Sequence, residues 1–217
     1  MEKSMSYKVW GITPKNEEQK VALKYLTDPS VELVVLNGGA GSGKTLLSLA
    51  SALELVIEQH MYKEIIFTRG PTGVGEDLGH LPGELEEKLL PWMGALMDNL
   101  EMLVGDSKTT QSIIESKIKT ISIQHIRGRS LRGRFVIIDE VQNLTPQQLK
   151  VIITRIGENS KIVCLGDTSQ IDNRKLTIHN NALTILESRI GNEDFIKAVY
   201  LKDCERSRLS RWGGENL

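Results

Sequence analysis

Apolar runs of strand length alternate along the chain with segments whose apolar residues recur at helical spacing. The runs are rich in β-branched residues and occupy 31–36, 64–68, 120–124, 135–139, 161–166 and 195–201. The helical segments occupy 16–26, 44–59, 84–103, 107–117, 145–156 and 177–190. Because most runs are apolar almost throughout, both faces of these strands should be covered. The pattern predicts an α/β fold with a mostly parallel central sheet and helices on both faces.

Local signals mark several element ends. Thr145-Pro146 has the order of an N-cap and a first helical proline, and Thr13-Pro14 predicts a similar start for the N-terminal helix. Gly157 and Gly191 stand where helices are expected to stop. The glycine-rich stretch 70–83, "GPTGVGEDLGHLPG", predicts a long loop, either functional or a disordered excursion.

Length and composition favour one soluble domain. The 217 residues predict a single domain over 1–217, with 1–11 and 207–217 as candidate flexible ends. No apolar run reaches the ~18 residues of a membrane helix, and the N-terminus lacks the apolar segment of a secretory signal. Cys164 and Cys204 offer neither a disulfide framework nor a metal-ligand spacing. We therefore expect a cytoplasmic protein with no membrane partner.

The stretch "GGAGSGKT" follows the first apolar run and leads directly into a helical segment. Its spacing, G-x-x-x-x-G-K-[ST], is that of a phosphate-binding loop. Backbone N–H groups of such a loop surround the phosphates, Lys44 would reach the terminal phosphates, and Thr45 would ligate Mg²⁺. A glycine turn without a ligand is the alternative, which the strand and helix on either side disfavour. The predicted nucleotide-binding residues are Gly38, Gly39, Ala40, Gly41, Ser42, Gly43, Lys44 and Thr45.

Two further motifs end apolar runs. In "FVIIDEVQN", Asp139 would hold Mg²⁺ and Glu140 would orient and activate the attacking water, although two carboxylates can also be a solvated strand end. In "VCLGDTSQID", the amide of Gln170 would sense the γ-phosphate. Ligands of open α/β sheets bind beyond the carboxyl ends of the strands, so the three motifs together predict a nucleotide hydrolase.

Four stretches carry a resemblance to a known family. They are "GGAGSGKT", "GEDLGHLPGELEEKLLPW", "IRGRSLRGRFVIIDEVQN" and "GDTSQID". Together they resemble the PhoH-like ATPases, whose core is similar to the first RecA-like domain of superfamily 1 helicases. The resemblance runs from about residue 12 to about residue 208. It implies a single RecA-like P-loop NTPase domain that uses ATP and Mg²⁺.

The resemblance also implies roles for individual residues. Gln19 in "NEEQKVAL" would contact the adenine, and Gln170 would be the phosphate sensor. The sequence departs from the family pattern at three places. Arg69-Gly70-Pro71-Thr72 replaces "RPxV", His80 replaces a phenylalanine, and "KDCERSR" stands where "DVVRH" is expected, with Arg206 at the arginine.

A single RecA-like core implies an incomplete hydrolytic site. An arginine supplied to the transferring phosphoryl group is worth ~10³–10⁵ in rate, and related helicases take it from a second core. We therefore expect a ring-like homo-oligomer, a hexamer by similarity to the family, in which a neighbour supplies this arginine. Arg174, Arg206 and Arg208 are the candidates, each with a solvated surface charge as the alternative.

The net charge of −1 limits any polyanion site to a local patch. Such a patch is predicted at Arg127, Arg129, Arg132 and Arg134, a run that would follow the phosphates of single-stranded RNA or DNA or contact a neighbouring subunit's nucleotide. A solvated basic loop is the alternative. No aromatic residues interleave with the arginines, so sequence-specific base recognition is not expected.

The leading hypothesis is an Mg²⁺-dependent ATPase whose oligomer acts on, or is stimulated by, single-stranded RNA or DNA, with helicase activity possible. A P-loop kinase acting on a small molecule is the first alternative. It is disfavoured because adjacent Asp139 and Glu140 suit water activation. An ATP-controlled assembly factor without a nucleic-acid partner is the second alternative.

Overall fold

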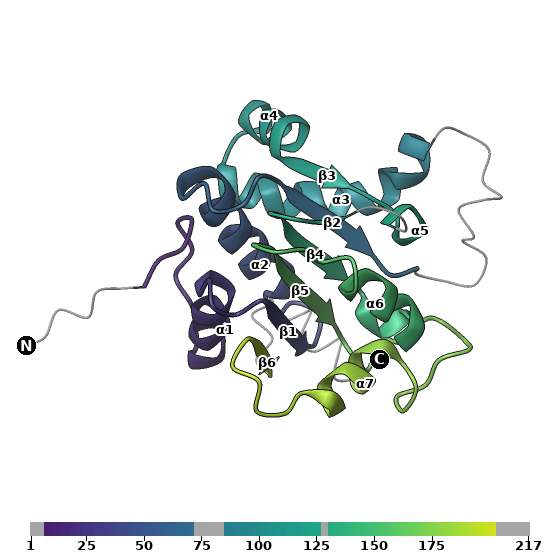
Figure 1. Ribbon diagram of the computed structural model, residues 1–217. Coiled ribbons are helices and arrows are strands. Elements are labelled where there is room, and N and C mark those ends of the chain that lie inside the picture. Colours follow the sequence, from purple (N-terminus) through teal and green to yellow (C-terminus); the bar gives the residue numbers. More distant parts are fainter. Residues whose placement is uncertain (1–6, 72–84, 127–129, 203–217) are drawn as a thin grey trace, which may run out of the picture.

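The computed structural model describes residues 7–71, 85–126 and 130–202 (Figure 1). Most of the predicted loop at 70–83 lies outside these residues. The same holds for Arg127, Arg129, Arg206 and Arg208, and for the predicted C-terminal tail.

The centre of the molecule is a six-stranded parallel sheet. Its strands are β1 (Leu33–Gly38), β2 (Ile65–Arg69), β3 (Ile118–Thr120), β4 (Phe135–Asp139), β5 (Lys161–Gly166) and β6 (Ile196–Leu201). They lie in the order β3-β2-β4-β5-β1-β6, and every neighbouring pair is parallel. The carboxyl ends of β4, β5 and β1, which carry the three predicted motifs, are therefore adjacent at one edge.

Helices cover both faces of this sheet, as Figure 1 shows. They are α1 (Glu17–Thr27), α2 (Lys44–Leu53), α3 (Leu85–Val104), α4 (Ser107–Lys117), α5 (Ile123–Ile126), α6 (Pro146–Ile153) and α7 (Ala182–Arg189). On one face of the sheet, helices α1, α2, α3 and α4 pack against strand side chains such as Val34 and Ile137 and form one apolar core. On the opposite face, helices α5, α6 and α7 pack against strand side chains such as Val35 and Ile138 and form a second apolar core. The α/β fold class predicted from the sequence is confirmed.

Two short helical segments depart from α geometry. A π-helical turn (Glu54–Glu58) continues α2, and a 3-10 turn (Val141–Asn143) follows β4. Within the described residues, no helix has the length and apolar character to span a membrane.

The prediction of a strand at 120–124 is wrong. The strand there ends at Thr120 and pairs with β2 over only three residues. The chain then turns at Ser122, whose hydroxyl lies 2.6 Å from His125 Nδ1, and α5 buries Ile126 completely. The β-branched residues of this run suggested a strand, but the chain forms a helical turn here that buries Ile126.

Two predicted helix starts are also wrong, because asparagine side chains cap the chain later. The helix predicted from 177 begins at Ala182, where Asn181 accepts a hydrogen bond from the Thr184 N–H at 3.0 Å. The N-terminal helix is capped by Asn16, which accepts from the Gln19 N–H at 2.8 Å, rather than opening at Thr13-Pro14. The Thr145 cap is confirmed, with its reciprocal partner Gln148.

Candidate nucleotide site

A cavity of about 320 Å³ opens at the carboxyl edge of the sheet. Three segments that are far apart in the sequence converge there: the loop after β1, the end of β4 and the turn after β5. The end of β2 and one residue of α3 complete the wall. The lining residues are Ala40, Gly41, Gly43, Lys44, Thr45, Leu46, Arg69, Asn99, Asp139, Glu140, Asp167 and Gln170.

The loop from Gly38 to Gly43 has a backbone that glycine permits and other residues oppose. Gly41 and Gly43 have φ of 82° and 92°, in the left-handed region. A Cβ on Gly38 would lie 2.4 Å from the Leu201 carbonyl oxygen of β6, so only glycine fits beside that strand. The buried Ser42 Oγ has no hydrogen-bond partner among the described residues. A narrow turn with an unpaired hydroxyl at a helix N-terminus suits a bound phosphate.

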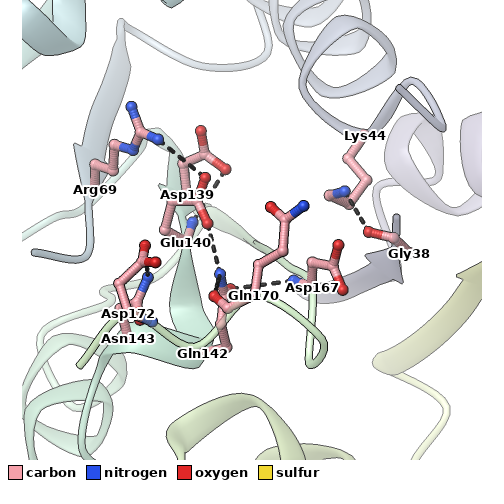
Figure 2. A network of polar contacts seen from close by, with 10 residues as sticks. All are labelled: Gly38, Lys44, Arg69, Asp139, Glu140, Gln142, Asn143, Asp167, Gln170 and Asp172. Atoms are coloured by element: carbon pink, nitrogen blue, oxygen red, sulfur yellow. Dashed lines mark hydrogen bonds and ion pairs between the residues drawn. The ribbon is translucent and has the colours of Figure 1, made fainter. Parts of the chain in front are cut away.

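Lys44 stands at the first position of α2 and folds over this loop (Figure 2). Its ammonium donates hydrogen bonds to the Gly39 carbonyl at 2.9 Å and to the Gly38 carbonyl. Thr45 follows it on the cavity wall. Both residues therefore line the cavity at the start of α2, the position that the loop motif predicts for them.

Asp139 and Glu140 face the loop from the end of β4. Burial, and after it the neighbouring Glu140 charge, raise the pKa of Asp139 to about 6, while Arg69 acts in the opposite direction. Glu140 has a left-handed backbone, with φ of 55°, and its carboxylate accepts a hydrogen bond from Arg69 Nη2 at 3.0 Å. Gly70 makes this turn possible, since a Cβ there would lie 2.4 Å from the Glu140 carbonyl oxygen.

Gln142 joins Glu140 to the turn after β5. Its Nε2 donates to Glu140 Oε2 at 2.6 Å and to the Gln170 carbonyl at 2.9 Å, while its Oε1 accepts from the Asp167 N–H at 3.1 Å (Figure 2). Asn143 similarly accepts from the backbone N–H groups of Asp172 and Asn173. Both amide side chains are fully buried. They hold the predicted sensor turn against the predicted water-activating carboxylate.

Three predicted site residues lie elsewhere. Gln19 is buried behind the loop, where its amide donates to the Ser42 carbonyl at 3.1 Å and accepts from the Lys15 N–H at 2.9 Å, and it does not line the cavity. Arg174 is exposed on the segment after the sensor turn. Arg132 lies before β4, at the opposite edge of the sheet. The adenine contact and the arginine roles remain predictions.

The sequence did not assign several residues that the structure places at this site, including Leu46 and Asp167 of the cavity lining. Arg69 drew notice only as part of a departure from the family pattern, although its position at the end of an apolar run is a usable signal. Gln142 and Asn143 follow the carboxylates directly, but nothing local shows where their amides point. Asn99 lies on α3 and lines the cavity, and no feature of its neighbours in sequence indicates this.

The oxygen-rich wall fits a magnesium ion bound together with phosphates. Asp139, Glu140 and the Thr45 hydroxyl share the cavity, and a carboxyl whose pKa is raised by burial and by a like charge gains from a nearby cation. Mg²⁺ is commonly held by one or two carboxylates plus substrate oxygens. Among the described residues, no group of three or more histidine, cysteine or acidic side chains could hold a metal by itself.

This fold and cavity define the class of P-loop NTPases. A family model described as PhoH-like protein matches residues 11–214, and the chain belongs to that family. Protein PhoH2 of Bacillus subtilis is 43% identical over 213 residues, covering 96% of this chain and 48% of the relative. Protein PhoH2 of Mycolicibacterium smegmatis is 36% identical over 203 residues, covering 93% and 46%. The chain thus spans about half the length of these relatives.

Among solved structures, the chain is similar to the Pif1 helicase from Candida albicans, with 16% identity and a TM-score of 0.41. That similarity covers 94% of this chain and 43% of the helicase.

Proposed function

We propose that this protein is an Mg²⁺-dependent ATP hydrolase. The observation that carries the proposal is the single cavity wall in which the phosphate loop, Asp139, Glu140 and Gln170 meet. A phosphate chain on the loop would lie between Lys44 and these three side chains. Membership of the PhoH-like family supports the same activity.

The side chains divide the chemistry between them. Lys44 would exchange the Gly38 and Gly39 carbonyls for phosphate oxygens, and Thr45 and Asp139 would hold the metal ion. Bound Mg²⁺ would neutralise charge on the phosphates. Glu140 would orient the attacking water and take its proton, with Arg69 and Gln142 fixing the direction of its carboxylate.

We propose that a neighbouring subunit supplies an arginine that stabilises the transferring phosphoryl group. Arg69 lines the cavity, but its guanidinium is already bound to Glu140. If Arg69 turned to the phosphoryl group, Glu140 would lose this partner. An arginine from outside the cavity can stabilise the phosphoryl group without that loss. We propose a homo-oligomer, a hexameric ring by family similarity, with Arg174 or Arg206 as the supplied residue.

Single-stranded RNA or DNA is the proposed partner that stimulates hydrolysis, with unwinding as a further possibility to test. Small-molecule kinase activity is the competing proposal, and transfer of phosphate to an acceptor would favour it. ATP-controlled assembly without a polynucleotide effect is the third.

The test is phosphate release from ATP and Mg²⁺ over a range of protein concentrations, with and without single-stranded RNA or DNA. Lys44→Ala should release no phosphate above background. Glu140→Gln should bind ATP with nearly unchanged affinity but hydrolyse it at least 100-fold more slowly, about 2.7 kcal/mol in activation free energy. Full activity in Glu140→Gln would overturn the assignment of the water-activating carboxylate.

Protein concentration and polynucleotide separate the remaining parts of the proposal. Specific activity that rises with protein concentration supports a shared site between subunits. A rate independent of concentration and equal in Arg174→Ala and Arg206→Ala would refute the supplied arginine.

A further inference from the structure

A second cavity, of about 570 Å³, lies at the amino edge of the sheet, opposite the nucleotide site. We call it the amino-edge groove. Its walls are the segments just before β2, β3, β4 and β5, four strands that are adjacent in the sheet. The lining includes three cations, Lys63, Lys117 and Arg132, together with His60, Tyr62, Gly133 and Asn159.

Cations in this groove are available to a ligand. The ammonium groups of Lys63 and Lys117 make no hydrogen bond or ion pair with any residue that the structure describes. Arg132 pairs with Glu158 at 2.9 Å, but these side chains are 65% and 79% exposed. Such a surface pair contributes little and exchanges readily for a stronger anion.

The partly buried Glu64, next to Lys63 in the sequence, does not cancel these charges. Glu64 lies between Lys119 and Arg134, at 2.7 Å from a nitrogen of each. Arg134 also donates to the Arg132 carbonyl, so this arginine of the predicted basic run holds the fold together rather than facing solvent freely. Five cations stand around the groove (Lys63, Lys117, Lys119, Arg132 and Arg134) against three acids (Glu64, Glu158 and Glu32, whose charge acts on Tyr62), so the local balance is positive although the whole chain has a net charge of −1.

The backbone around the groove is rigidly held. His60, Gly133 and Asn159 all adopt left-handed backbone conformations, with φ of 53°, 70° and 57°. The Lys63 N–H donates to the Gly133 carbonyl at 2.9 Å, and the Gly133 N–H donates to the Glu158 carbonyl at 3.2 Å. A Cβ on Gly133 would lie 3.5 Å from Lys63 Cε, so the lysine stem runs over this glycine. A backbone that is already held in place loses less entropy when an anion binds to its side chains.

Apart from the exposed His60, the described lining of the groove offers no accessible ring for base stacking. Its aromatic residue, Tyr62, is 8% exposed and packs edge-on against Phe135, with ring centroids 5.6 Å apart. Recognition here must therefore depend on charge rather than on base identity.

We propose that the amino-edge groove binds the phosphodiester backbone of a single strand of RNA or DNA, through Lys63, Lys117 and Arg132. This inference rests on the proposed function, because it locates the polynucleotide partner named there. Strand β4 leads from Arg134 directly to Asp139, and its five residues span about 13 Å at ~3.3 Å each. A strand bound in the groove would act on hydrolysis through β4 and its neighbours, without touching the nucleotide of the same subunit.

The test is fluorescence anisotropy with labelled single-stranded 12-mers of RNA, of DNA and of DNA with uncharged methylphosphonate linkages, without ATP. The variant is Lys63→Gln with Lys117→Gln. The matched control is Lys24→Gln with Lys150→Gln, which removes two exposed lysines from α1 and α6.

Losing two phosphate contacts should weaken binding of RNA and of DNA about 20-fold at 0.1 M salt. It should also lower the slope of log affinity against log salt by about 1.4, at ~0.7 for each contact with a single strand. The control should bind charged strands like the parent. The uncharged strand should bind to none of the three proteins. Basal ATP hydrolysis should be equal in all three proteins.

The outcomes separate this inference from the proposed function. If the parent binds charged strands and the groove variant binds them equally well, the groove assignment is overturned. The proposal of a polynucleotide partner then stands. If the parent binds no charged strand, the polynucleotide partner is overturned together with the groove. In that case, comparing basal hydrolysis of the parent with that of Lys44→Ala still tests the proposed ATPase activity by itself. Equal binding of the uncharged strand would overturn recognition through phosphate.

Discussion

Replacing Asp139 with asparagine should stabilise the nucleotide-free protein while it abolishes hydrolysis. The pKa of Asp139 is raised from 3.8 to about 6 by burial and by the Glu140 charge. Between these values the native state binds more protons than the unfolded chain, so the free energy of unfolding falls as pH rises. The penalty is absent below about pH 4, grows up to about pH 6 and is complete above it.

The magnitude follows from the pKa difference. At 1.36 kcal/mol for each pKa unit, a rise from 3.8 to about 6 corresponds to a penalty of about 3 kcal/mol. Asp139 is partly exposed to the cavity, and solvent screening reduces this to about 1–2 kcal/mol. Asparagine keeps an oxygen that can accept the Glu140 N–H, which lies 3.0 Å from Asp139 Oδ1, so the substitution removes charge and little else.

The assay is urea unfolding of the parent and Asp139→Asn at several pH values between 4 and 8, without nucleotide and with a metal chelator. The variant should be more stable by about 1–2 kcal/mol at pH 7.5, and the difference should approach zero near pH 4. Asp194→Asn, at an exposed position before β6, is the matched control and should change little. Adding ATP and Mg²⁺ should stabilise the parent more than the variant.

A variant less stable than the parent at pH 7.5 would refute this reasoning, because the ionised Asp139 would then stabilise the fold. A stability difference that does not change with pH would refute it as well, since the effect could not come from the charge.

Four further substitutions, one of them a control, test particular contacts. Gln142→Ala should lower kcat about tenfold, with the KM for ATP nearly unchanged, because Glu140 loses a 2.6 Å hydrogen bond that positions it; an unchanged kcat would contradict this role. Gly70→Ala should lower the free energy of unfolding by more than about 2 kcal/mol in urea titrations, whereas Gly39→Ala, where a Cβ meets nothing within 4 Å, should cost less. Lys161→Met should cost about 2–4 kcal/mol by the same assay, because the buried ammonium donates to three backbone carbonyls near the end of α1; a cost below 1 kcal/mol would show that water replaces them.

The sequence by itself determined the fold class and predicted the centre of the candidate nucleotide site. Fully apolar strands require cover on both faces, and the glycine-rich loop and the Asp139-Glu140 pair each stand within a few residues of a strand end. Parallel strands bring their carboxyl ends to one edge, so local signals at three strand ends predict a shared site. Elements with weaker local signals, such as the segment at 120–124, were misassigned because burial of Ile126 depends on its distant neighbours.

Only the tertiary structure decided which side chains face one another. Arg69 reaches Glu140 across 71 positions of sequence, and Gln142 reaches the Gln170 carbonyl across 28. The amino-edge groove is likewise built from the starts of four strands, and it unites Lys63 and Lys117, which share no motif. Hydrogen bonds and charge pairs act over a few ångströms in space. Strand order, which no local pattern contains, therefore selects the partners.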